Sequence, residues 1–133
     1  MTIKVLYVED HPASVDIMRR RLQDQDIQLF VAPNGEAGID LAHRLKPDLI
    51  LMDINMPGMD GIEAMSHIRD NRLTRHIPIV LMTVSTSERT RVYAQMMGCD
   101  DYLVKPVEQA DFLETLAQFL PMSLPAQSHQ RSA

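Results

Sequence analysis

Short apolar segments alternate along this chain with longer segments in which apolar residues recur at helical spacing. The apolar segments are residues 5–8, 27–31, 49–52, 77–82 and 101–105. Runs of this length, rich in Val, Ile and Leu, predict strands buried on both faces of a sheet. In residues 27–31 the strongly apolar positions alternate with the rest of the segment, which favours an edge strand.

The segments between these strands predict helices. Val15, Met18 and Leu22 form one apolar stripe, and Pro12 suits the first turn of that helix. The other helices are expected at residues 34–46, from Asp60 onward, at about 87–97, and along the apolar stripe of residues 112–120. Lys46 precedes Pro47 and Gly98 follows Met97, and both positions favour a helix end.

Five strands that alternate with five helices predict an α/β fold. The expected architecture is a flavodoxin-like, doubly wound, five-stranded parallel sheet, with right-handed crossovers and helices on both faces. A chain of 133 residues has room for one such domain, which we assign to residues 1–120. Residues 121–133 have little to bury and are expected to be a disordered tail or the start of a linker.

Composition narrows the classes of function. The formal net charge of −5 argues against direct nucleic-acid binding, which needs a basic surface. The basic run Arg19-Arg20-Arg21 is flanked by acids and is interpreted as a solvated helix face. Cys99 is the only cysteine, so it cannot form an internal disulfide, and it is expected to be a small buried filler. With no apolar run long enough to span a membrane, we expect a soluble, cytoplasmic protein.

Chemically distinctive residues follow the predicted strands. Glu9 and Asp10 follow the first strand, Asp53 the third, Thr83 the fourth and Lys105 the fifth. In a doubly wound sheet these loops open at the same edge, so the side chains should converge. Clustered carboxylates repel each other unless a cation lies among them, and oxygen ligands suit Mg²⁺. The hydroxyl and the ammonium are then suited to an anion such as a phosphoryl group.

With these motifs in this order, the chain resembles the receiver domain of two-component response regulators over residues 3 to 120. The resemblance includes Glu9-Asp10, Asp53 followed by residues 56–61, Thr83, and Lys105-Pro106. It implies that Asp53 accepts a phosphoryl group from a sensor histidine kinase or a histidine phosphotransfer protein. Such a domain is not an enzyme in the usual sense, although it assists its own phosphorylation and dephosphorylation.

The resemblance also assigns metal ligands. It implies that Mg²⁺, or Mn²⁺ in its place, is held by Asp10, Asp53 and the main-chain carbonyl of Asn55, with Glu9 acting through a water. Lys105 would pair with the phosphoryl oxygens, and the bond before Pro106 is expected to be cis.

Other residues are assigned to the switch and to its lifetime. The resemblance implies that Thr83 moves onto the phosphoryl group and that Tyr102 is the switch aromatic. Val84 is larger than the usual small residue there and is expected to crowd the site, while Asn55 and Ser85 would tune the lifetime of the phosphorylated form. Helix 4, strand 5 and helix 5 would form the output face, for a downstream protein, a fused output domain or a homodimer.

Several alternatives remain open. A Mg²⁺-dependent phosphohydrolase with an aspartyl-phosphate intermediate also places an Asp after a central strand, but its usual second acid is replaced here by Asn55. A receiver-like domain that only docks without phosphorylation is a second alternative. His11 could be a metal ligand, although an exposed loop position is favoured. Met96 and Met97 are interpreted as core filler or as part of an adaptable docking surface.

Overall fold

The computed structural model describes residues 2–122, which form five strands and five helices in alternation. In chain order they are β1 (Ile3–Val8), α1 (Pro12–Leu22), β2 (Ile27–Ala32), α2 (Gly35–Leu45), β3 (Leu49–Asp53), α3 (Gly61–Asp70), β4 (Ile79–Thr83), α4 (Glu88–Met96), β5 (Asp101–Val104) and α5 (Gln109–Phe119). The predicted tail begins at Pro121, and its residues 123–133 lie outside the described part of the chain.

The strands form one parallel sheet in the order β2-β1-β3-β4-β5. The predicted flavodoxin-like fold class is therefore confirmed. β3 lies at the centre of the sheet, and all five of its residues are buried. The carboxyl ends of β1, β3, β4 and β5 share one edge, because parallel strands all end on the same side.

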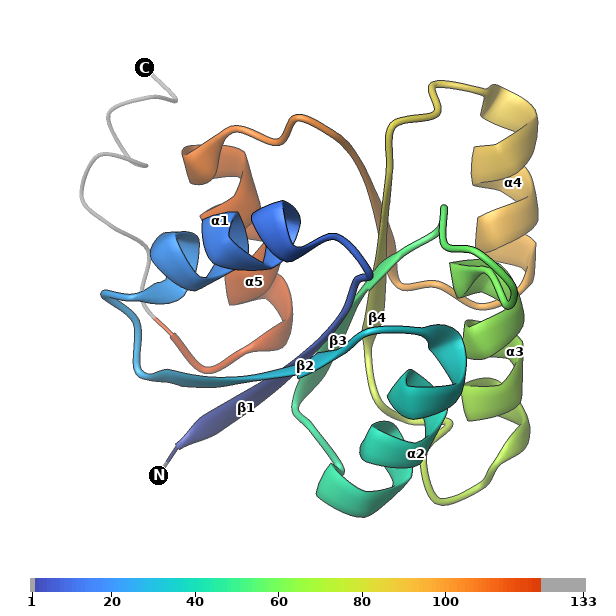
Figure 1. Ribbon diagram of the computed structural model, residues 1–133, viewed down its shortest axis with the longest axis horizontal. Coiled ribbons are helices and arrows are strands. Elements are labelled where there is room, and N and C mark those ends of the chain that lie inside the picture. The colour runs from blue at the N-terminus through green and yellow to red at the C-terminus, as the bar shows by residue number, and fades with distance from the viewer. Residues whose placement is uncertain (1, 123–133) are drawn as a thin grey trace.

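Helices cover both faces of the sheet, with α1 and α5 on one side and α2, α3 and α4 on the other (Figure 1). Alternate residues of each central strand point to opposite cores. In β3, Leu49 and Leu51 pack in the core under α1 and α5, whereas Ile50 and Met52 pack in the core under α2 and α3. Because both faces of these strands are buried, their sequences are unbroken runs of apolar residues.

Three of the helices begin with a side chain that caps the first turn. Asn34, Asp60 and Ser87 each accept a hydrogen bond from a backbone N–H in the first turn of the helix that follows. The fourth strand starts later than predicted, at Ile79, because Ile77 and Pro78 form the approach to the sheet and Pro78 lacks an N–H for the ladder.

Among residues 2–122, the helices are all too short or too polar to cross a membrane. Cys99 is only partly buried and packs at the margin of the core on the α2–α4 side. The prediction of a small buried filler was therefore only partly right.

Candidate functional site

Asp53 is the last residue of β3 and carries a buried carboxylate at the edge where the strands end. The backbone after it stays in register, since the N–H of Ile54 donates to the carbonyl of Met82. Burial raises the pKa of the Asp53 carboxyl, the nearby Lys105 ammonium lowers it, and Glu9 raises it again. The net direction is upward, as expected for a carboxylate placed among other acids with little solvent.

Gly61 allows α3 to begin directly against this strand end. Its N–H donates to the carbonyl oxygen of Ile54 at 3.0 Å. A Cβ at this position would collide with the backbone carbonyl oxygen of Asp53 and would lie 2.9 Å from the Cα of Ile54. Only glycine permits this close approach, so Gly61 shapes the loop that presents Asp53.

Lys105 reaches Asp53 from the loop after β5. Its Nζ lies 3.4 Å from Oδ1 of Asp53 and 3.1 Å from Oε1 of Glu9. The backbone N–H of Lys105 donates to the carbonyl of Thr83, and the Lys105–Pro106 peptide bond is cis. One ammonium therefore bridges two carboxylates that follow different strands, as expected for residues gathered at this edge.

Glu9 is held in a fixed position below the surface. Its carboxylate accepts hydrogen bonds from the Tyr7 hydroxyl at 3.0 Å and from the backbone N–H groups of Asp10 and His11. Burial and the Glu9 carboxylate together raise the pKa of Tyr7, so this phenol stays a hydrogen-bond donor. The sequence pattern predicted Tyr7 as a core residue and gave no signal for its contact with Glu9.

Asp10 is the more exposed acid of the pair. Its Oδ1 lies 3.2 Å from Nδ1 of His11, whose side chain is 69 % exposed. Burial acts to raise the pKa of Asp10, but hydrogen bonds from His11 and from its own backbone N–H outweigh it and hold the pKa below its ordinary value. The lowered pKa favours the ionised form of the Asp10 carboxylate.

Within residues 2–122, the structure gathers Glu9, Asp10 and His11 so that one potential ligand atom from each lies within 4.8 Å of the others. Asp53 lies beside this group, because the Lys105 ammonium contacts both Asp53 and Glu9. Carboxylate oxygens dominate the set, and hard oxygen ligands fit Mg²⁺ or Mn²⁺. His11 has the exposed loop position that the sequence favoured, although its ring stands closer to the acids than the sequence indicated.

Thr83 ends β4 with its side chain fully buried. Its hydroxyl donates to Oδ1 of Asn55 at 2.7 Å and accepts from the backbone N–H of Ser85 at 3.1 Å. The hydroxyl thus has both a donor and an acceptor partner, and one of them is the side chain two residues after Asp53.

Val84 and Tyr102 differ in their surroundings. Val84 is 70 % exposed and lines a cavity that Lys105 also lines. Tyr102 packs at the margin of the core, and its buried hydroxyl has no hydrogen-bond partner among the described residues. Burial raises its pKa. A buried hydroxyl without a hydrogen-bond partner costs free energy.

Apolar side chains are exposed on α4 and β5. Val92, Tyr93 and Met96 of α4 and Val104 of β5 are each more than a third exposed. Only Ala94 of α4 is buried. We refer to these four exposed residues as the α4–β5 patch. Met96 therefore belongs to a surface and not to the core, whereas Met97 packs against the core.

Comparison with known proteins agrees with this geometry. A family described as "Response regulator receiver domain" matches residues 5–117. Protein PilH of Pseudomonas aeruginosa is 34 % identical over 113 residues, which are 85 % of this chain and 93 % of PilH. The nitrate/nitrite response regulator protein NarL of Escherichia coli K12 is 40 % identical over 86 % of this chain, and the match spans about half, 53 %, of NarL.

Among solved structures, the receiver domain of sensor histidine kinase PA1611 from Pseudomonas aeruginosa superimposes with a TM-score of 0.82 and 28 % identity. The match covers 90 % of this chain and 98 % of that domain. That crystal structure has a magnesium ion coordinated in its active site cleft.

Proposed function

Because this chain belongs to the response regulator receiver domain family, we propose that it is a signalling switch that accepts a phosphoryl group on Asp53. The observation that carries the proposal is the buried Asp53 carboxylate with the Lys105 ammonium 3.4 Å away. The proposed donor is the phosphohistidine of a sensor histidine kinase or of a histidine phosphotransfer protein. Receiver domains of this family act generally as phosphoacceptors and not as catalysts.

In the proposed transfer, a carboxylate oxygen of Asp53 forms a bond to phosphorus while the bond between phosphorus and the donor imidazole nitrogen breaks. The imidazole leaves with the electron pair and takes up a proton. Lys105 donates to a phosphoryl oxygen. Its ammonium thereby replaces its contact with the Asp53 carboxylate by a contact with the transferred group. Positioning and charge neutralisation supply most of the acceleration in such transfers.

The transfer requires that charge be neutralised among several acids. Asp10, Asp53 and the main-chain carbonyl of Asn55 would hold Mg²⁺ or Mn²⁺, and Glu9 would act through a bound water. The donor set fits, because it consists of oxygens with ionised carboxylates among them. When bound, the cation would screen the phosphoryl oxygens and those carboxylates from each other. The magnesium ion in the PA1611 receiver domain supports this assignment.

Phosphorylation gives Asp53 nearly one further negative charge and new acceptor oxygens. In the proposed switch, Thr83 leaves Asn55 to donate to a phosphoryl oxygen, and Tyr102 repacks. Moving a two-state element from 1:99 to 99:1 takes about 5.5 kcal/mol. A single charge-assisted hydrogen bond supplies only about 1.5–3 kcal/mol, so Thr83, Lys105 and the cation must act together.

We assign output to the face formed by α4, β5 and α5. The α4–β5 patch supplies exposed apolar area there, and Met96 adds an adaptable side chain. A downstream protein, a fused output domain or a second phosphorylated copy could occupy this face. The lifetime of the phosphorylated form would depend on Val84, Asn55 and Ser85, which follow Asp53 and Thr83 closely in sequence.

The number of turnovers distinguishes this switch from an aspartyl-phosphate phosphohydrolase. Asn55 occupies the place where such hydrolases carry a proton donor, and an amide cannot protonate a leaving group. We expect the protein, mixed with Mg²⁺ and a phosphorylated histidine phosphotransfer protein, to take up at most one phosphoryl group per chain. Release of many phosphates per chain from simple phosphate esters would favour the hydrolase. Absence of transfer from every histidine donor would favour a domain that only docks.

A further inference from the structure

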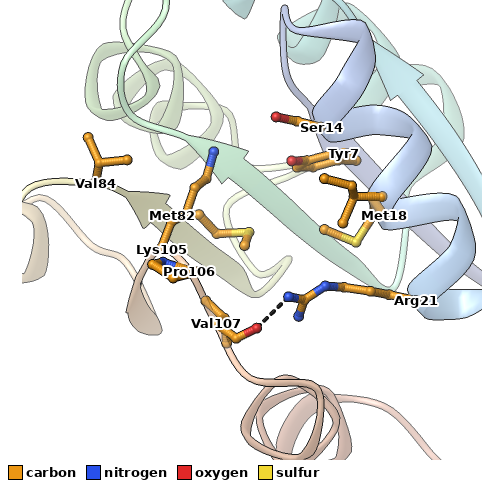
Figure 2. Close-up of a pocket in the computed structure, with 10 residues that line it drawn as sticks. Tyr7, Ser14, Met18, Arg21, Met82, Val84, Lys105, Pro106 and Val107 are labelled. Atoms are coloured by element: carbon orange, nitrogen blue, oxygen red, sulfur yellow. Dashed lines mark hydrogen bonds between the residues drawn. The ribbon is translucent and has the colours of Figure 1, made fainter.

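A cavity of about 350 Å³ opens beside the proposed phosphoacceptor site, between α1 and the chain that follows β5. Figure 2 shows Tyr7 and Ser14 on one side of it and Val84, Lys105 and Val107 on the other, with Arg21 reaching across from α1. Pockets of this volume are of the size that holds small organic ligands. Of the residues that line this cavity, the proposed phosphoryl transfer uses only Lys105.

The lining combines apolar walls with positive charge. Ile17, Met18, Met82 and Val107 contribute apolar surface. Among residues 2–122, the lining includes Arg21 and Lys105 but no Asp or Glu. Lys105 is already paired with two carboxylates. The charge that remains for a ligand is therefore that of Arg21, which favours one negative charge on a mostly apolar molecule.

Arg21 is incompletely satisfied. One terminal nitrogen, Nη2, donates to the carbonyl oxygen of Val107, and the guanidinium lies 5.3 Å from the centroid of the Phe112 ring. The other, Nη1, is buried and has no hydrogen-bond partner among the described residues. A buried donor without an acceptor costs free energy, and a carboxylate can receive both terminal nitrogens of an arginine.

We propose that this cavity binds a small monocarboxylate with an apolar body of roughly ten carbon atoms. The apolar part would lie against Ile17, Met18 and Met82. Because Nη1 is enclosed by protein and Nη2 is bonded to Val107, the guanidinium must turn toward the cavity to meet the carboxylate. A polyanion such as a nucleotide fits poorly, because the walls offer a polyphosphate only one unpaired cation.

A ligand in the cavity can affect the phosphoacceptor site through two residues that line the cavity, Lys105 and Tyr7. Lys105 contacts both Glu9 and Asp53, and the Tyr7 hydroxyl donates to the same Glu9 carboxylate. A ligand that shifts either lining residue changes the charges around Asp53. This coupling rests on the proposed function, whereas binding of the acid does not.

Phenylbutanoate is a suitable probe, and the test uses the full chain without phosphorylation, in EDTA. We expect saturable NMR shifts centred on Met18, Met82 and Val107, with a Kd on the order of 1 mM for a ligand of this size. The neutral phenylbutanol should bind about tenfold more weakly, because it lacks the charge-assisted bond to Arg21. Shifts that are absent, or centred elsewhere, overturn the site. Equal binding of acid and alcohol overturns the anion assignment.

Three variants locate the ligand. Arg21→Met keeps the aliphatic stem and should weaken phenylbutanoate about tenfold while leaving phenylbutanol unchanged. Val107→Phe should fill the cavity and abolish the binding of both. Arg19→Met, on the same helix but outside the lining, should bind as the original chain does. A Val107→Phe protein with a native spectrum and undiminished binding overturns the proposal.

The coupling has its own readout. Saturating phenylbutanoate should change the rate at which a small phosphodonor labels Asp53 in the original chain and leave that rate unchanged in Val107→Phe. Binding without any change in rate overturns the coupling and leaves the site standing. Failure of labelling in every condition overturns the proposed function, and the binding measurement is then still decisive for the cavity.

Discussion

The Thr83 hydroxyl donates a 2.7 Å hydrogen bond to the side-chain oxygen of Asn55, two residues beyond Asp53. In the proposed switch Thr83 moves onto the phosphoryl group, so this bond must break. Asn55→Ala should lower the free energy of unfolding by about 1 kcal/mol and tighten binding of the phosphoryl mimic beryllofluoride with Mg²⁺. Urea unfolding and a beryllofluoride titration followed by NMR measure the two effects. Gln28→Ala, which removes an exposed amide on β2, is the control. A weaker beryllofluoride complex in Asn55→Ala would contradict this role.

Gly61 should tolerate no side chain. Gly61→Ala places a methyl group against the backbone of Asp53 and Ile54, and we expect a loss of about 1–3 kcal/mol in the free energy of unfolding. The loop that presents Asp53 should shift with it, so phosphodonor labelling should slow. Gly58→Ala is the matched comparison: its Cβ meets nothing, and only the positive φ of 76° is strained, at about 1 kcal/mol. Equal losses in the two variants would argue against the close approach.

The pH dependence of stability should reveal the raised pKa of Asp53. In EDTA, the folded protein keeps a proton on Asp53 at pH values where the unfolded chain, near its ordinary pKa of 3.8, has lost it. The free energy of unfolding therefore falls as pH rises through this window and stays lower above it. Asp53→Asn should stabilise the protein at neutral pH by about 0.5–2 kcal/mol, and the gain should vanish as pH falls toward 3.8.

Asp10 provides a control of opposite sign. Its folded pKa is lowered, so its contribution is present above its unfolded pKa and disappears as pH falls through the folded value. Asp10→Asn should therefore destabilise the protein at neutral pH. Urea titrations of both variants at neutral and acidic pH test the pair, and an Asp53→Asn protein that is less stable than the original at neutral pH would refute the raised pKa.

Metal binding should stabilise the fold through the acidic residues and not through His11. With Mg²⁺ at a hundred times its Kd, the free energy of unfolding should rise by about 2.7 kcal/mol. Asp10→Asn should abolish most of this gain, whereas His11→Ala should retain it. Unfolding in Mg²⁺ and in EDTA measures the difference. Equal losses in the two variants would make His11 a ligand.

The fold was predictable because its signals are local. Leu49 to Met52 form an unbroken apolar run that ends in an acid, and such a run indicates a central parallel strand without knowledge of its neighbours. Parallel topology then brings the residues after the strands to one edge of the sheet. The proximity of Lys105 to Asp53 and Glu9 could therefore be predicted from the sequence.

Contacts between side chains of different elements were not predictable in the same way. The bond from Tyr7 to Glu9, the acceptor of Thr83 and the partners of Arg21 depend on rotamers and on distances set by the whole fold. Arg21 was interpreted as part of a solvated helix face, whereas the structure directs it inward against Val107 and Phe112. Consecutive residues of a helix point in different directions. The sequence of three arginines therefore does not show which of them points into the protein.

The most direct test of Asp53 as the phosphoacceptor is the intact mass of the protein after incubation with acetyl phosphate. With Mg²⁺ present, the original chain should gain the mass of one phosphoryl group, and it should gain none in EDTA. Asp53→Asn should remain unlabelled in both conditions. Equal labelling of Asp53→Asn, or no labelling of a folded original chain in Mg²⁺, would contradict the assignment.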